Sequence, residues 1–188
     1  RDVAVTGVQT CALPIYLMAA ISENEIFRLL EGALRPRQQL VSQDHDTAFR
    51  LFNGFYEGLP SLVADIYART LVLFSYCENE TESVLLTQAA RDFYLEAFPW
   101  IKCVIAKGRQ SANADSRKGS VTFGEKPDER IREAGALYAV DLLLNQDASF
   151  YLDTRGLRAW LLENARGLEV LNTFAYTGSL GVAALFAG

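Results

Sequence analysis

The sequence of 188 residues contains one histidine, one methionine and three cysteines. Cys77 and Cys103 stand alone, without the paired spacing of a zinc or redox motif, and Cys11 lies close to the start of the chain. This scarcity favours a cytoplasmic protein whose cysteines pack as small apolar side chains, and it predicts no metal site. The only histidine, His45, lies between Asp44 and Asp46 without a partner motif, which indicates a solvated turn rather than a catalytic base.

The chain also lacks an excess of positive charge and a long apolar run. Its net charge is -5, and no stretch of about 18 apolar residues is present, so no membrane span is predicted. The acidic balance argues against a basic nucleic-acid surface over the whole chain. Any RNA contact must therefore come from local patches. One basic stretch is concentrated enough for phosphate binding, although a solvated loop explains it equally well; it comprises Lys102, Lys107, Arg109, Arg117 and Lys118.

The first residues do not read as part of a fold. The segment from Val5 to Ile15 resembles the in-frame translation of a sequencing-library adapter, and residues 1–17 are therefore interpreted as an artefactual leader. A secretory signal is disfavoured because Pro14 interrupts the apolar run and no basic leader precedes it. Residues 18–44 are then an N-terminal helix and a linker.

The middle of the chain predicts a strands-helix-strands order, which is typical of an α+β domain over residues 45–148. A helix over 22–35 precedes it, with Ser22 and Glu25 matching a capping box. A second helix is predicted over 80–98 and ends at Pro99. The predicted strands cover 47–52, 62–67, 70–76, 101–106, 120–124 and 136–144, and the polar run 107–119 is predicted to be an exposed loop.

The C-terminal residues 149–188 have a different character. A helix is expected through Ala165, with one apolar face formed by Leu157, Trp160, Leu161 and Ala165. The apolar run 168–171 predicts a buried strand of a parallel sheet, and a new helix is expected from Leu180. Gly178 and Gly181 would let the backbone approach a ligand at the carboxyl end of that strand.

Two motifs in this region resemble a known family. The segments Phe150-Tyr151-Leu152-Asp153-Thr154-Arg155 and Leu171-Asn172-Thr173-Phe174-Ala175-Tyr176-Thr177-Gly178 resemble those of the class I S-adenosylmethionine-dependent methyltransferases of the large-subunit ribosomal RNA type. The resemblance extends upstream through 46–54, 57–60 and 63–67, and so covers about residues 45–188.

The resemblance implies an α+β domain followed by the first strand and helix of a truncated Rossmann-like methyltransferase domain, with S-adenosylmethionine as cofactor and ribosomal RNA, modified at cytosine C5, as partner. In the family the catalytic residues follow the cofactor motif, so they are expected beyond Gly188 and the chain itself is expected to be inactive. Cys77 and Cys103 precede the motif and cannot be the family's cysteine nucleophile.

The resemblance also assigns the site residues. The first loop of the family holds the aminocarboxylate end of the cofactor, so backbone N–H groups at the start of the last helix are the expected anion contacts. Asp153 could instead cap its helix or pair with Arg155, and Phe174 and Tyr176 could pack the loop rather than contact the cofactor. The predicted cofactor site comprises Asn172, Phe174, Tyr176, Thr177, Gly178, Ser179, Asp153 and Arg155. The predicted RNA contacts are Lys107, Arg109, Arg117 and Lys118.

Two other interpretations remain. The chain could be a non-catalytic α+β module that binds nucleic acid or serves as a scaffold. A dehydrogenase is disfavoured, because the segment from Asn172 to Gly178 lacks the G-x-G-x-x-G spacing of a pyrophosphate-binding loop.

Overall fold

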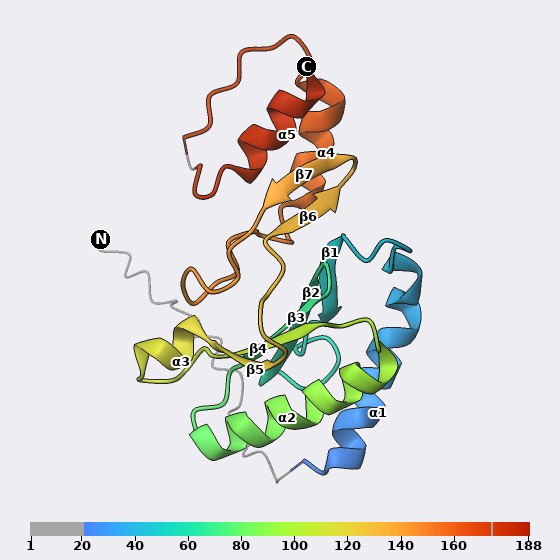
Figure 1. Cartoon of the computed structure of the whole chain (residues 1–188), viewed down its shortest axis with the longest axis vertical. Coiled ribbons are helices and arrows are strands. Elements are labelled where there is room, and N and C mark those ends of the chain that lie inside the picture. Colours follow the sequence, from blue (N-terminus) through green and yellow to red (C-terminus); the bar gives the residue numbers. More distant parts are fainter. Residues whose placement is uncertain (1–20, 174) are drawn as a thin grey trace, which may run out of the picture.

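The computed structural model describes residues 21–173 and 175–188. The predictions made for the leader 1–17 and for Phe174 lie outside the described residues. A five-stranded sheet occupies one end of the described structure, and the last two helices occupy the other (Figure 1).

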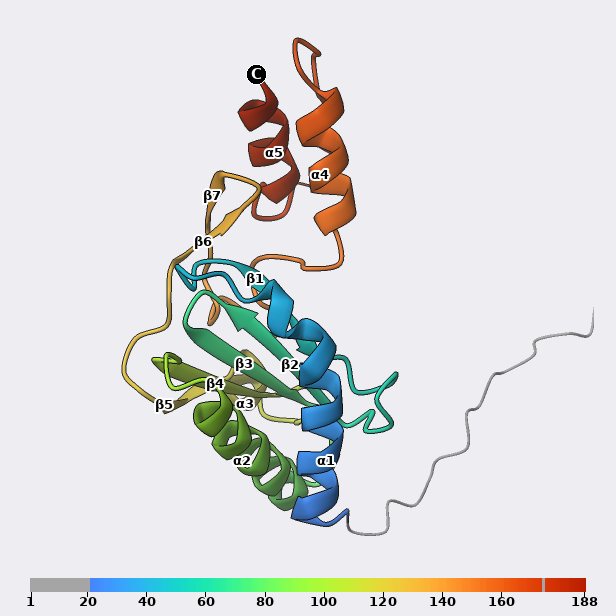
Figure 2. The same ribbon diagram turned by 90° about the vertical axis from the view of Figure 1, so that its right-hand side faces the viewer.

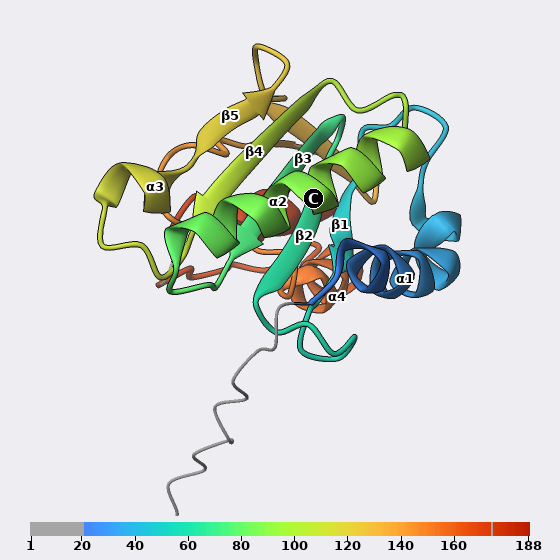
Figure 3. The same cartoon turned by 90° about the horizontal axis from the view of Figure 1, so that it is seen from below.

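The sheet is mixed. Its strands are β1 (Ala48–Phe52), β2 (Leu62–Tyr67), β3 (Thr70–Ser75), β4 (Cys103–Gly108) and β5 (Ser120–Phe123), in the order β1-β2-β3-β4-β5. Only β3 and β4 are parallel, and helix α2 (Glu80–Ala97) provides the crossover that a parallel pair requires. Figure 3 shows α2 lying across one face of the sheet. All five strands match predicted strands, with small shifts at their ends.

The helices on this face begin where the sequence predicts. Ser22 caps helix α1 (Glu23–Leu34) by accepting a hydrogen bond from the Glu25 N–H at 3.3 Å. Asn79 caps α2 by the same kind of bond to the Glu82 N–H at 3.1 Å. Each cap satisfies one of the N–H groups that a helix start leaves free. A short 3₁₀ helix, η1 (Arg35–Leu40), follows α1.

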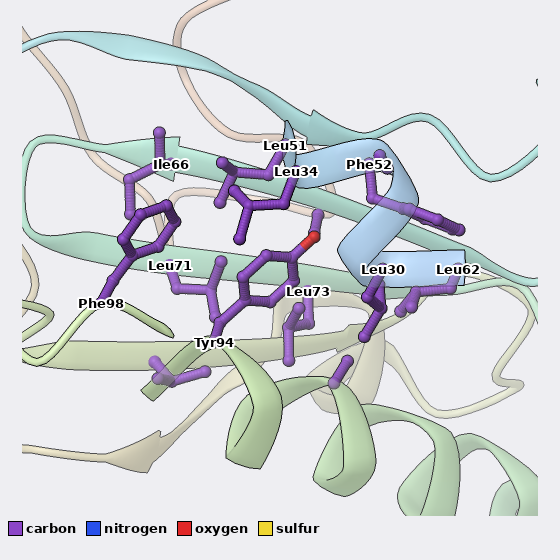
Figure 4. Close-up of a cluster of buried hydrophobic side chains, with 14 of the residues drawn as sticks. Leu30, Leu34, Leu51, Phe52, Leu62, Ile66, Leu71, Leu73, Tyr94 and Phe98 are labelled. Atoms are coloured by element: carbon purple, nitrogen blue, oxygen red, sulfur yellow. The ribbon is translucent and has the colours of Figure 1, made fainter. Parts of the chain in front are cut away.

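The central strands β2 and β3 are buried on both faces. Because side chains alternate along a strand, the two strands contribute to two separate apolar clusters. The first lies between the sheet and the helices α1 and α2, and Figure 4 shows its side chains converging from both; the ten labelled there are Leu30, Leu34, Leu51, Phe52, Leu62, Ile66, Leu71, Leu73, Tyr94 and Phe98. The second cluster lies on the opposite face and includes Val72, Ile131, Tyr138 and Phe150.

The second face is covered by a hairpin that the sequence analysis only half predicted. Its strands are β6 (Arg130–Glu133) and β7 (Ala136–Ala139). The two-residue turn between them holds Ala134 at φ 49° and Gly135 at φ 84°, as a type I′ turn requires. The strand predicted over 136–144 therefore ends at Ala139, and β6 was missed because its sequence is mostly charged.

Three further helices complete the described structure. They are α3 (Ala114–Lys118), α4 (Arg155–Asn164) and α5 (Ser179–Ala187). Helices α4 and α5 lie side by side, away from α1 and α2, as Figures 1 and 2 show. The helix expected from Leu180 is confirmed and begins one residue earlier.

Two C-terminal predictions are wrong. The run 168–171 forms no strand, and Leu168, Val170 and Leu171 are 64%, 47% and 87% exposed. A strand needs a hydrogen-bonding neighbour, and none of the described strands lies beside this run. The predicted apolar face of α4 is also wrong, because Leu157 and Trp160 are exposed whereas the charged Arg158 is buried.

Candidate functional site

The loop that leads into α5 has the geometry of an anion-binding site. Gly178 adopts a left-handed conformation, φ 83°, and α5 begins immediately after it. No side chain caps this helix start. The first N–H groups of an α-helix have no partner within the helix, so those that follow Gly178 are available to a ligand. The positive end of the helix dipole favours a negatively charged one.

Three contacts hold the loop against the segment 145–151. The Asn145 amide donates to the Tyr176 hydroxyl at 2.9 Å, and the Thr177 hydroxyl donates to the Ser149 carbonyl at 2.5 Å. The ring of Tyr151 lies 5.1 Å from that of Tyr176. The structure therefore fixes Tyr176 and Thr177 against this segment, directly before the start of α5. Asn172 lies beside the first turn of α5, because its amide is the nearest group to a side chain built at Gly181.

The segment Ser149–Tyr151 connects the loop to the rest of the molecule. Its three successive carbonyl groups accept hydrogen bonds from three different elements. Ser149 accepts from Thr177 of the loop, and Phe150 accepts from the Tyr67 hydroxyl of β2 at 3.1 Å. Tyr151 accepts from the Arg158 guanidinium of α4 at 2.8 Å. The position of the loop is thus set by the sheet and by α4 together.

Arg158 is the most important residue that the sequence analysis missed. Its side chain is fully buried and makes a bidentate ion pair with Glu133 of β6, at 2.6 and 3.0 Å. Its guanidinium lies 4.0 Å from the centre of the Phe150 ring. These contacts join α4 to the hairpin. The available signal was that Arg158 lies at helical spacing from the apolar Ala165. Its partner Glu133 lies 25 residues away, and no local pattern links the two residues.

The structure corrects the roles considered for Asp153 and Arg155. Arg155 lies 3.6 Å from Glu133, so it joins the Arg158 ion pair rather than pairing with Asp153. Thr154, and not Asp153, occupies the capping position of α4. Asp153 instead lines a groove next to the loop.

The predicted exposed basic loop is also corrected. Lys107 belongs to β4, is fully buried and donates to the carbonyls of Asn145 and Asp147 at 2.7 and 3.1 Å. Burial lowers the pKa of its ammonium group to about 8. Arg109 donates to the Gln146 carbonyl and pairs with Asp147 at 2.5 Å. Both residues therefore support the turn that carries Asn145, whose amide bonds Tyr176.

The remaining two predicted RNA contacts lie on or near α3. Arg117 donates to the carbonyls of Ser111 and Ala112, at 2.7 and 2.9 Å, and Lys118 is exposed. The structure does not unite the four basic residues in one free patch. Of the four, Lys118 is the one left exposed to solvent, and its contact with RNA stays a prediction.

A groove of about 160 Å³ lies between the sheet and the segment 147–153. On the sheet side, Arg50 of β1 makes a bidentate ion pair with Asp65 of β2, at 2.7 and 3.1 Å. Burial raises the pKa of the Asp65 carboxyl, and the neighbouring Arg50 only partly opposes this effect. Aromatic side chains form much of the remaining wall; they are Tyr67, Phe74, Tyr76, Phe150 and Tyr151.

Neither of the two described cysteines lines the groove. Cys103 is buried in β4, where burial raises the pKa of its thiol to about 11, and Cys77 lines a different pocket beside α2. Within residues 21–173 and 175–188, no cluster of three histidine, cysteine or acidic side chains is placed to hold a metal ion. None of the helices described in the same residues is both long and apolar enough to cross a membrane.

Comparison with known proteins bears directly on the candidate loop. The model of the S-adenosylmethionine-dependent methyltransferase family matches residues 57–188, which include all of the groove lining except Arg50, together with the buried Arg158–Glu133 ion pair and the loop. Ribosomal RNA large subunit methyltransferase I of Aeromonas hydrophila is 34% identical over 165 residues, and its Aeromonas salmonicida counterpart is 35% identical over 166. Each alignment covers 86% of this chain but 41% of the relative, so the chain spans about two fifths of their length.

Solved structures show the same fold. A candidate S-adenosylmethionine-dependent methyltransferase from Streptococcus mutans matches with a TM-score of 0.75 and 23% identity, over 89% of this chain and 43% of that one. A candidate methyltransferase in complex with SAH matches with a TM-score of 0.76 over the same shares of the two chains, again at 23% identity.

Proposed function

The chain belongs to the S-adenosylmethionine-dependent methyltransferase family, and we propose that it forms part of an enzyme that methylates large-subunit ribosomal RNA. The relatives that share 34–35% of its residues carry that activity in their names. The proposal assigns the 172–179 loop to the cofactor. It also places the protein in the cytoplasm, where ribosomal RNA is processed.

One observation carries this proposal: the uncapped start of α5 follows a left-handed glycine within the segment that matches the family. S-adenosylmethionine carries a carboxylate and an ammonium group at one end. The free N–H groups after Gly178 suit the carboxylate, and the Asn172 amide, beside Gly181, can bond either group. Tyr176 and Thr177 hold the loop in this conformation through their bonds to Asn145 and Ser149.

The finer proposal is that the methyl acceptor is C5 of a cytosine. It rests on the resemblance of the two C-terminal motifs to the large-subunit ribosomal RNA methyltransferases. The test is to methylate RNA with a chain of the length of its relatives and to analyse the nucleosides by liquid chromatography and mass spectrometry. This method separates 5-methylcytidine from other methylated nucleosides.

We further propose that the 188-residue chain alone binds the cofactor weakly and transfers no methyl group. Thr177 is exposed and Tyr176 is 48% exposed, so the loop is an open surface rather than a cleft. Cofactor sites usually bury most of the ligand surface. The open surface of the loop would leave the adenosine moiety exposed to solvent.

Isothermal titration with S-adenosylmethionine tests the assignment of the loop. The titration is run on this chain and on a chain extended to the length of its relatives. In the extended chain, Gly178→Ala should weaken binding at least tenfold, because an L side chain is strained at φ 83°. Gly167→Ala is the matched control, since Gly167 also has a positive φ, 71°, and open space around it.

Two results would contradict the proposal. Equal losses in the two glycine variants would show that backbone strain anywhere in the segment 165–178 is sufficient, and that the conformation of Gly178 has no specific part in cofactor binding. Micromolar binding by the 188-residue chain, unaffected by Gly178→Ala, would place the cofactor elsewhere.

A further inference from the structure

The groove of about 160 Å³ beside the candidate loop is lined by aromatic and charged side chains. Two of its tyrosines are partly open to solvent, Tyr76 at 38% and Tyr151 at 41%. The Arg109 guanidinium lies 5.9 Å from the ring centres of both Phe74 and Tyr76. Aromatic faces and guanidinium planes are the groups on which unpaired bases stack in RNA-binding proteins.

The charges of the groove argue against a phosphate. Each arginine in its wall is already paired with a carboxylate, Arg50 with Asp65 and Arg109 with Asp147. Asp153 adds a further carboxylate, and within the described residues it makes no hydrogen bond or ion pair with a side chain. The net charge of the wall is therefore negative. A phosphate would be repelled, whereas an uncharged heterocycle with an amino group could donate to Asp153.

The groove is coupled to the candidate cofactor loop by direct contacts. Tyr151 lines the groove and its ring also packs on Tyr176 of the loop. Arg109 lines it too, and through Asp147 it supports the turn that carries Asn145. A base in the groove would thus lie one side chain away from the loop.

We propose that this groove binds one unpaired base of the RNA substrate, a base that carries an exocyclic amino group. The inference rests on the proposed function, which supplies RNA as the substrate. It adds the place where one base binds and the chemical class of that base. Tyr76 and Tyr151 stack on the base, and the Asp153 carboxylate accepts a hydrogen bond from the amino group. The small volume suits one planar ring, so the backbone of the RNA stays outside.

Fluorescence anisotropy with labelled single-stranded oligonucleotides tests the inference on the 188-residue chain. The probes are oligo(C) and oligo(U) of eight nucleotides. Tyr76→Leu should weaken oligo(C) binding about tenfold, the order expected for loss of one stacked base. Tyr56→Leu is the matched control, because Tyr56 is 84% exposed and does not line the groove. Thermal melting of each variant checks that the fold is retained.

Three further measurements test how the base is held. The dependence of log Kd on log salt should be the same for wild type and Tyr76→Leu, because a stacking side chain releases no counterion. Asp153→Asn should reduce the preference for oligo(C) over oligo(U), since an amide serves a carbonyl of uracil as well as an amino group. Free cytidine is titrated in parallel and should bind more weakly than the oligonucleotide.

The outcomes distinguish this inference from the proposed function. If the chain binds RNA but Tyr76→Leu behaves as Tyr56→Leu does, the groove is not a base site and the proposed function stands. If neither oligonucleotide binds, the groove is rejected as a base site, whereas the proposed function is decided separately by methylation of RNA with a chain of its relatives' length. A changed salt dependence in Tyr76→Leu, or cytidine binding as tight as that of oligo(C), would overturn the inference in favour of a phosphate or a free nucleoside.

Discussion

In strand β3 every side chain is buried, whereas helix α5, which contains no charged residue, buries only Ala183. The difference lies in their neighbours. Strand β3 has a strand on each side and an apolar cluster on each face. Among the described helices and strands, α5 packs mainly against α4 and β7, and it leaves Leu185 and Phe186 83% and 56% exposed. An apolar sequence is therefore buried only where other elements cover it.

The two regions are also held together by different forces. The sheet and its two helices are joined by apolar burial, which contributes roughly 25 cal/mol per Å². The C-terminal helices are attached through a smaller apolar contact, Val182 against the second cluster, and through polar contacts, above all Arg158 with Glu133 and Thr177 with Ser149. A single hydrogen bond contributes only about 1 kcal/mol net, so we expect the C-terminal region to open more readily than the sheet.

The largest effect should come from a cavity in the sheet region. Leu71 of β3 is fully buried, and Leu71→Ala should lower the free energy of unfolding by about 3 to 4 kcal/mol. Urea denaturation followed by the fluorescence of Trp100, which packs against this core, measures the loss in a Trp160→Phe background. A loss below about 1 kcal/mol would mean that the sheet does not form the main core.

A nearly equal effect is expected when the ion pair between Arg158 and Glu133 is broken. Arg158→Met leaves the Glu133 carboxylate buried beside only the more distant Arg155, and should destabilise the C-terminal region by about 3 kcal/mol. Hydrogen exchange of α4 and α5 measures this change. The double variant Arg158→Met with Glu133→Leu should recover most of the loss. Equal exchange in wild type and in the single variant would show that the ion pair does not hold these helices.

A pH effect should follow from the buried lysine that joins the two regions. Because burial lowers the pKa of Lys107 to about 8, below its ordinary value of 10.5, the folded protein releases this proton before the unfolded chain does. Stability should therefore rise with pH across the window between these values, by about 2 kcal/mol from pH 7 to pH 9.5.

Urea denaturation at the two pH values checks this, with Lys107→Met as the reference for all other titrating groups. The gain should be present in wild type and absent in the variant. Parallel pH profiles for the two proteins would rule out the lysine as its source.

The smallest effect is expected on the exposed apolar surface. Leu171 is 87% exposed, so Leu171→Ser should change the free energy of unfolding by less than about 0.5 kcal/mol. It should nevertheless reduce the binding of a hydrophobic dye, because the exposed surface around Leu168 and Leu171 is apolar. A destabilisation as large as that of Leu71→Ala would show that the two regions are packed alike.

The local signals of the sequence were sufficient for most elements of the sheet region. The capping residues Ser22 and Asn79 begin their helices, and the apolar runs of β2 and β3 form buried strands. Which face of a helix is buried was less predictable. On α2 the apolar Val84 and Leu85 are exposed, whereas Leu86, Ala90 and Tyr94 are buried against the core.

The candidate site shows the same limit. The sequence predicted a loop with Gly178 directly before a helix of small residues, because glycine tolerates the left-handed backbone there. The sequence did not predict that Lys107 is buried and bonded to the 145–147 turn. Its partners, Asn145 and Asp147, lie 38 and 40 residues away along the chain.

The sequence by itself therefore determined much of the local conformation of this protein: the starts of α1, α2 and α5 and the alternation that sends strand side chains to two clusters. Only the tertiary structure decided which of the apolar runs would be buried and which charged side chains would pair. Local conformation depends on neighbours within a few residues. Burial and ion pairing depend on elements that approach from distant parts of the chain, as Glu133 does for Arg158 and the sheet does for Phe150.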